Sequence, residues 1–337
     1  MPAKRLMALV LLAALPAMGA EPPRNGALDY YRASLLVSKA TSGERAADKL
    51  DWDKIGSNLD PAKMPPEFEE AKKELSADAV EQFIRGSRAP ACDFQPHTED
   101  GWKMLLPELA MMRTLTRQVR VDARAKMMEG DAGGAADRIA AMYRASAHAT
   151  TGDTLISTLV GAAIARTADV EARVLAESGK LGEADRAKVL EALRPLKKDG
   201  LRFHAALEGE RRITTGWLKM EYAGPGAPAR FVRDFVDLSK EQGREETRRR
   251  AAAITKLSPQ EFAEAATKMD GYYAEMLKDW DGPNPKDTLA SLEKRLTDGE
   301  FGPIAAVLAP AMSNVRRSYE KCAESLNSAE EALTKKP

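Results

Sequence analysis

The sequence is poor in the residues and motifs on which common catalytic sites depend. Its 337 residues include only three histidines and two cysteines. It lacks the metalloprotease motif HExxH, the nucleophile motif GxSxG, the P-loop, the dinucleotide motif GxGxxG and the redox motif CxxC. These absences leave few schemes for a metal centre or an activated nucleophile, and we expect neither a bound metal nor a cofactor.

Neither sign of charge dominates the chain. Lysine plus arginine and aspartate plus glutamate each number 51. A protein that binds nucleic acid needs a basic surface or a clear basic stripe, so this balance argues against nucleic acid as a partner. The dense charge run at 241–250 mixes both signs, with two glutamates four residues before two arginines. This spacing is typical of a solvated, ion-paired helix face.

No apolar run is long enough to cross a bilayer, but a shorter one stands near the N-terminus. Lys4 and Arg5 precede a Leu- and Ala-rich stretch at 6–15, and the small residues AMGA follow at 17–20. This pattern is typical of a cleavable secretory signal, and the run is shorter than the ~20 residues of a span. We therefore expect a signal peptide at 1–20 and a mature chain in the periplasm or outside the cell, with no membrane span.

The two cysteines are Cys92 and Cys322. In an exported chain a small, even number of cysteines favours a structural disulfide. Such a bridge would enclose residues 93–321 and would stabilise the fold by up to about 5 kcal/mol in the chain-entropy model. Two buried free thiols are the alternative, because the sequence does not show whether the two Cα atoms approach each other.

Apolar residues recur at helical spacing along the mature chain, whereas turn residues and period-two alternation never combine into a hairpin signal. We predict an all-α fold of stacked antiparallel helical hairpins, an irregular tetratricopeptide-like or bundle-like array without a sheet. The main helices are expected at 102–129, 132–149, 153–177, 184–196, 201–222, 286–297 and 303–333.

Two features divide and join these helices. The segment AGPGAPA at 223–229 is the clearest helix breaker. It predicts an N-terminal helical domain at 21–222, a hinge at 223–229 and a C-terminal helical region at 230–337. Ser157, Gly161 and Ala165 form a row of small residues, which predicts close packing of two helices or, alternatively, self-assembly through this face.

The segment 123–146 resembles the inner turn of a tetratricopeptide-like helical hairpin. Gly130 and Asp131 stand at the tight turn, and Ala136 stands where the second helix must come close to the first. A weaker echo occurs at 177–193, and the period of 34 residues is absent, so the resemblance covers one hairpin.

A broader resemblance extends over residues 25–220. The segments that carry it are 25–30, Cys92-Asp93-Phe94, Glu129-Gly130-Asp131, 154–161 and 207–211. In these the chain is similar to a group of uncharacterised bacterial proteins that carry signal peptides. The resemblance implies secretion and an α-helical fold, and it implies no activity and no catalytic residue.

His204 and Glu208 are the best local candidates for chemistry. Four residues apart, they share a helix face and could ligate a metal or act as a base and its orienting group. With Arg211 or Arg212, and with His148 from a neighbouring helix, they could serve a hydrolase that acts on envelope material. The alternative is an ordinary ion pair between Glu208 and Arg212 at i,i+4.

Five aromatic residues lie on either side of the expected hinge: Trp217, Tyr222, Tyr272, Tyr273 and Trp280. Aromatic clusters at clefts bind ligands or peptides, although rows at helical spacing also form interhelical core. Because catalytic signatures are missing, we expect a non-catalytic scaffold that binds an envelope protein or peptide. An envelope hydrolase that uses His204 and Glu208 is the alternative.

Overall fold

The structure is a computed structural model, and it describes residues 23–40, 45–238, 244–309 and 312–335. Within these ranges the chain is α-helical and contains no strand, which confirms the predicted all-α class; one isolated β-bridge joins Asn25 to Ala91. The predicted signal peptide at 1–20 lies outside the described residues.

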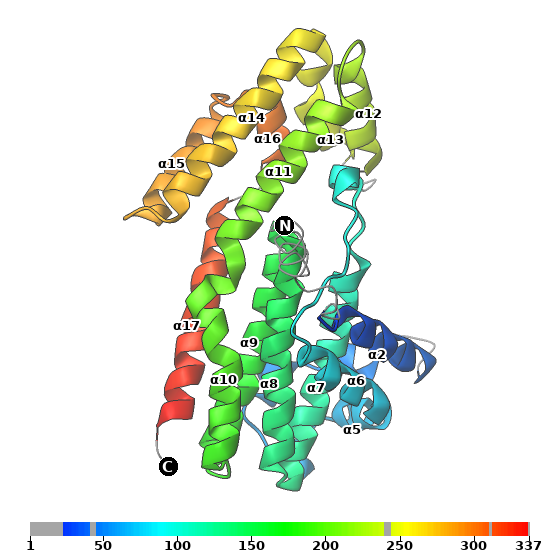
Figure 1. Cartoon of the computed structure of the whole chain (residues 1–337), viewed down its shortest axis with the longest axis vertical. Helices are drawn as coiled ribbons and strands as arrows, with labels where there is room; N and C mark the ends of the chain where they lie inside the picture. Colours follow the sequence, from blue (N-terminus) through cyan, green and yellow to red (C-terminus); the bar gives the residue numbers. More distant parts are fainter. Residues whose placement is uncertain (1–22, 41–44, 239–243, 310–311, 336–337) are drawn as a thin grey trace, which may run out of the picture.

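Five helices stand side by side and form the lower bundle of the molecule (Figure 1). They are α7 (Pro107–Glu129), α8 (Ala132–Ala149), α9 (Leu155–Glu177), α10 (Glu183–Asp199) and α17 (Met312–Thr334). The N-terminal helices lie at one side of this bundle: α2 (Ala27–Ala40), α3 (Ala46–Lys49), α4 (Trp52–Ile55), α5 (Pro66–Lys73) and α6 (Ala77–Ser87).

A long helix, α11 (Phe203–Glu221), rises from the bundle to an upper layer of helices (Figure 1). This layer consists of α12 (Ala227–Leu238), α13 (Arg244–Ala251), α14 (Pro259–Trp280), α15 (Pro285–Thr297) and α16 (Gly302–Leu308). Residues 223–226 of the predicted hinge form a turn between α11 and α12, with Gly224 and Gly226 at φ of 78° and 73°, whereas residues 227–229 already belong to α12. One hydrophobic core continues on both sides of this turn, so the two predicted regions share it.

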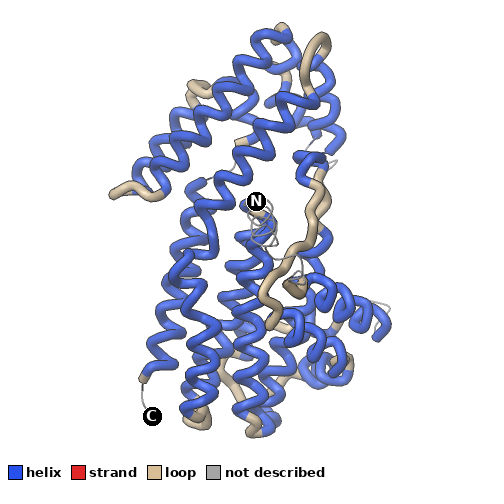
Figure 2. Tube along the Cα trace, in the orientation of Figure 1, coloured by secondary structure: helices blue, strands red, loops and turns tan. Residues whose placement is uncertain are grey.

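The connection from α6 to α7 runs largely as a loop along one side of the molecule (Figure 2). It contains the 3-10 turn η2 (Thr98–Lys103), so the helix expected from 102 begins only at Pro107. The reason is local: the residue before a proline is disfavoured in the helical region, and Leu106 has φ −121° and ψ 61°.

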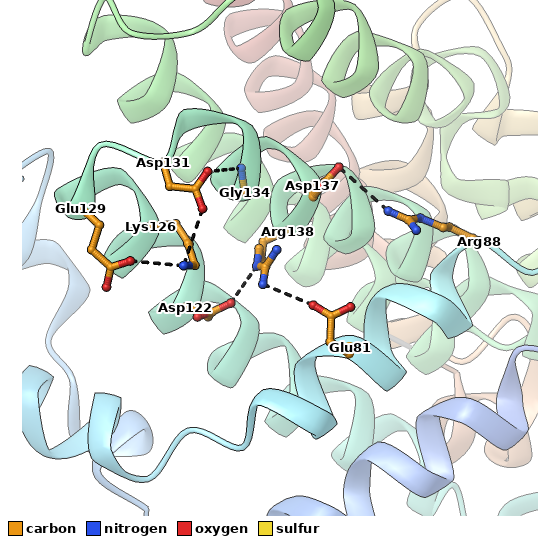
Figure 3. Close-up of polar contacts among 9 residues, drawn as sticks. All are labelled: Glu81, Arg88, Asp122, Lys126, Glu129, Asp131, Gly134, Asp137 and Arg138. Carbon is orange, nitrogen blue, oxygen red and sulfur yellow. Dashed lines mark hydrogen bonds and ion pairs between the residues drawn. The ribbon is translucent and has the colours of Figure 1, made fainter.

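The hairpin of α7 and α8 turns where the sequence predicts. Gly130 adopts a left-handed φ of 83°, and the Asp131 carboxylate accepts a 2.8 Å hydrogen bond from the Gly134 N–H (Figure 3). Lys126 lies 3.2 Å from Glu129 and 3.6 Å from Asp131, which neutralises part of the acidic turn (Figure 3). The turn is thus confirmed, and the wider tetratricopeptide-like stacking stays a prediction.

The row of small residues packs α9 against α8. A Cβ on Gly161 would lie 2.6 Å from Thr150 Cγ2 and 2.9 Å from the Ser146 carbonyl oxygen, so only glycine fits. The Ser146 hydroxyl donates a 2.8 Å hydrogen bond to the Gly161 carbonyl. Ser157 and Ala165 are buried as well, and the row is therefore not available for self-assembly.

Both cysteines are buried free thiols, so the structure shows the alternative to the predicted disulfide. Each is held among different neighbours. The Cys92 carbonyl accepts a 2.9 Å hydrogen bond from the Thr151 hydroxyl, whereas Cys322 Sγ lies 3.8 Å from the Ala162 carbonyl oxygen on α9. Burial raises the pKa of both thiols to about 12, so they stay protonated.

An ion pair without exposed surface joins α7 to α9. Arg124 and Glu171 are both 0% exposed, and Nε and Nη2 of the arginine donate bonds of 2.8 and 3.0 Å to the two carboxylate oxygens. Arg120 Nε donates a further 2.8 Å bond to the same carboxylate. Arg124 Nη1 donates to the carbonyls of Gly56 and Asn58, at 2.9 and 3.1 Å.

These arginines also anchor a second, smaller core. It is formed by buried residues of α3, α4 and α5 with Val121 of α7, and Trp52 packs against it. The Arg120 guanidinium lies 3.7 Å from the centre of the Trp52 ring, a cation–π contact. The N-terminal segment is therefore fixed to the bundle by the same charged group that joins α7 to α9.

Another buried carboxylate, Asp169, lies on α9. It is fully buried and accepts a 2.7 Å hydrogen bond from the Tyr143 hydroxyl of α8. Burial raises its pKa from 3.8 to about 6, although hydrogen bonds from Ser325 and Tyr143 and the charges of Arg173 and Arg166 oppose the shift. Ionisation of Asp169 in the folded protein is thus costly.

Neutralising Glu171 should strongly destabilise the protein. Glu171→Gln leaves the Arg124 guanidinium buried without its charge partner, and we expect a loss of about 3–5 kcal/mol in the free energy of unfolding. Asp48→Asn is the matched control, because Asp48 of α3 pairs at 2.7 Å with Arg117, which lies on α7 as Arg124 does, and both side chains of this pair are partly exposed. It should cost less than about 1 kcal/mol. Equal losses for the two variants in urea denaturation would contradict this assignment.

Asp169→Asn should make the protein more stable at pH 7. Because the folded pKa is above the ordinary 3.8, the folded state binds more protons than the unfolded state up to about pH 6. Stability contributed by this group therefore falls as pH rises through that window. The amide cannot ionise, so we expect a gain of about 1–3 kcal/mol at pH 7 and none at pH 3. Urea denaturation at both pH values measures this, and a variant less stable than wild type at pH 7 contradicts it.

Candidate functional site

The pair predicted from the sequence, His204 and Glu208, lies on an open surface. His204 Nε2 is 3.6 Å from Glu208 Oε1, and His204 Nδ1 is 2.7 Å from Asp281 Oδ2. The two predicted side chains are 46% and 59% exposed, and neither lines any of the pockets described below. Both imidazole nitrogens therefore face carboxylates in water, which is the geometry of a surface ion pair.

The other members of the predicted hydrolase group point elsewhere. Arg211 makes a bidentate pair with Asp270, at 2.7 and 2.9 Å. Arg212 lies 4.0 Å from Asp153. His148 Nδ1 lies 2.9 Å from the Tyr30 hydroxyl of α2. The structure thus does not assemble His204, Glu208 and these residues into one site.

The five aromatic residues form core and not a binding surface. Trp217, Tyr222, Tyr272, Tyr273 and Trp280 are at most 5% exposed. Trp217 packs edge-on against Tyr222 at 5.0 Å between ring centroids, and Trp280 stacks on Phe203 at 5.7 Å. Of the two readings that the sequence left open, the structure therefore shows the interhelical core, because other rings and helices cover these residues.

The structure instead shows a groove between α8, α10 and the corner that follows α6. We call it the α8–α10 groove; its volume is about 430 Å³. Arg88 lies at the α6 corner, Arg144 and His148 come from α8, and Glu191 and Leu196 come from α10. A larger depression along α10, of about 690 Å³, shares Glu191 with the groove and extends it past Arg194 and Lys198.

His148 is held in the groove as a neutral ring. Its Nδ1 lies 2.9 Å from the Tyr30 hydroxyl of α2, and a hydrogen bond to the Ala89 backbone holds the ring further. Burial, reinforced by the nearby charge of Arg144, lowers its pKa from 6.5 to about 4. Burial also raises the pKa of Tyr30, so its hydroxyl keeps its proton and can donate to Nδ1. His148 is thus a fixed wall of the groove.

Arg144 is a cation of the groove that lacks a counter-ion among the described residues. It is half-buried, and within the described part of the chain it makes no hydrogen bond or ion pair. Arg88 is exposed and lies 4.0 Å from Asp137 (Figure 3). Lys188 approaches the same carboxylate more closely, at 2.8 Å. Glu191 is the one acidic residue among those that line the groove. Two arginines against one glutamate leave it positive.

One side of this groove, the face of α8, could have been predicted from the sequence. Arg144 and His148 stand four residues apart on α8, the same spacing as His204 and Glu208. This spacing shows a shared face, but only the fold brings the corner at 87–89 and α10 to that face.

Other site types find no support in the described residues. No group of three or more His, Cys, Asp or Glu there is arranged to hold a metal ion. Likewise, none of the helices that the structure describes combines the length and apolar character of a bilayer span. No family model, curated protein or solved structure matches the chain. The resemblance to signal-bearing bacterial proteins stays a prediction.

His148 should titrate far below the ordinary value for histidine. We expect an NMR midpoint near pH 4, with the resonance assigned by its loss in His148→Asn. Because the folded pKa is depressed, the stability that this group contributes is complete above about pH 6.5 and is lost as pH falls toward 4.

The size of this effect is up to about 3 kcal/mol. It should be measured as the difference between wild type and His148→Asn, because Asp169 changes stability in the opposite sense over much of the same window. A His148 midpoint near 6.5 would show that the ring is solvated and would remove it from the groove wall.

Proposed function

We propose that this chain is a non-catalytic binding protein of the cell envelope whose α8–α10 groove takes an acidic segment of a partner protein or peptide. The observation that carries the proposal is Arg144, a half-buried cation without an anionic partner in the described part of the chain. A partly desolvated guanidinium gains more from a carboxylate than an exposed one does, because the local dielectric is lower.

The shape and lining of the groove support this reading. Its volume of about 430 Å³ suits a few side chains, and Ala147, Ala192 and Leu196 supply apolar surface beside the charges. Arg88 stands at the corner and can bind a second acidic group. Two guanidinium groups and apolar surface in one groove fit a segment in which acidic and apolar residues alternate or share a helix face.

The envelope location belongs to the same proposal and rests on the signal-like pattern at 1–20. The alternative function, an envelope hydrolase at His204 and Glu208, gains no support from the geometry, since both side chains are exposed and His204 pairs with the carboxylates of Glu208 and Asp281. His148 does not replace them, because its ring is neutral, fixed and hydrogen-bonded.

Binding of a fluorescent acidic peptide, with Glu and Leu in alternation, tests the groove. We expect Arg144→Gln to raise the Kd at least about tenfold, the equivalent of 1.4 kcal/mol. Arg113→Gln is the matched control: it removes the same charge from α7, where Arg113 lines a separate depression. It should change the Kd less than about twofold.

The same titration has a second readout. A carboxylate bound beside Arg144 should raise the pKa of His148 from about 4, because a nearby negative charge favours the protonated ring. Equal binding of a Gln-for-Glu peptide, or equal weakening by Arg144→Gln and Arg113→Gln, would mean that the groove does not select an acidic segment.

A further inference from the structure

The first described helix, α2, carries an uncovered apolar face. Leu28, Tyr31 and Leu35 stand three and four residues apart and are 60%, 39% and 65% exposed. They are half of the large apolar side chains that the described part of the chain exposes. The opposite face of α2, with Tyr30 and Val37, is buried in the core, so the helix cannot turn its apolar face inward.

Three arginines gather around Asp29, the residue next to Leu28 in this helix. Arg24, Arg32 and Arg85 all pair with one carboxylate, that of Asp29, which is 2% exposed; the last two lie 3.7 and 3.4 Å from it. Three positive charges thus share one negative charge. Arg32 belongs to the apolar face itself, since it stands four residues after Leu28 and three before Leu35.

We propose that α2 is a membrane-docking helix, whose exposed face of Leu28, Tyr31, Arg32 and Leu35 lies on an anionic lipid surface. An interfacial helix needs apolar side chains that enter the boundary of the acyl chains and cations that meet the headgroups. α2 has both on one face. Its 14 residues make it ~21 Å long, and it lies at the edge of the molecule in Figure 1, where a flat surface can reach it.

A second copy of the chain fits this face less well. In a symmetric dimer the arginines of the two α2 helices would meet and repel each other. Three partly exposed apolar side chains also supply far less than the ~1,200 Å² that a stable interface buries. An anionic bilayer has the complementary charge and accepts a narrow apolar stripe.

The test is a fluorophore placed on the face. We would introduce Leu35→Cys into the full chain and label it with NBD, whose emission shifts to the blue on leaving water. Cys92 and Cys322 are buried, and burial raises the pKa of both thiols to about 12, so the added thiol reacts selectively. Met220→Cys is the matched control, because Met220 is 70% exposed on α11.

Vesicles of phosphatidylglycerol and phosphatidylcholine should shift the emission of the label at 35 and leave the label at 220 unchanged. Vesicles of phosphatidylcholine alone should bind at least about tenfold more weakly, and Arg32→Gln should weaken binding about fivefold. Leu28→Ala should weaken it about fivefold or more. The two labels separate docking by α2 from binding through the apolar run at 6–15, which would leave both in water.

Three results would overturn the proposal. One is protein that co-sediments with vesicles while the label at 35 stays in water. Another is a shift at 35 that depends on protein concentration without vesicles, which would indicate a second copy. The third is an equal shift with neutral vesicles, or with a soluble acidic peptide alone.

Discussion

The guanidinium of Arg124 and the carboxylate of Glu171 meet where α7, α9 and the N-terminal segment come together, and neither is exposed to solvent. Burying two charges costs several kcal/mol, and this cost is recovered only when every donor and acceptor is used. Here the carboxylate receives bonds from two arginines, and the guanidinium also satisfies two backbone carbonyls at the end of α4. The second core depends on this arrangement, because its three short helices bury too little apolar surface to hold their place alone.

Much of the fold could be read from local chemistry. Gly130 and Asp131 predict the tight turn because a left-handed residue and an N-cap are needed there. The row at Ser157, Gly161 and Ala165 predicts close packing of two helices, and the structure shows that the second helix is α8. Long-range pairing could not be read in the same way. Arg124 and Glu171 are 47 residues apart, and nothing in their spacing distinguishes them from the many charged residues that remain in solvent.

The candidate site also depends on long-range contacts that the sequence does not reveal. His204–Glu208 and Arg144–His148 have identical spacing on their helices, so the sequence gives no reason to prefer one over the other. Burial distinguishes them: the first pair is open to water, and the second lies under α2 and beside α10. The aromatic residues follow the same rule. Helical spacing predicts a shared face, but whether that face is covered depends on segments distant in the sequence. Trp217 is an example, because the backbone of Gly101 in η2 packs directly against its ring.

The two proposed surfaces of the molecule meet in α2. Its buried face carries Tyr30, whose hydroxyl holds His148 in the groove, and its exposed face carries Leu28, Tyr31 and Leu35. The buried residue Asp29 lies on α2 beside both faces and pairs with Arg85 of α6, close to the corner at 87–89 that lines the groove. A helix tied on one side to the groove and placed on the other against lipid would hold the groove at a fixed height above the membrane. Such a position suits a protein that binds segments of partners at the envelope surface, because both binding events then use one rigid element.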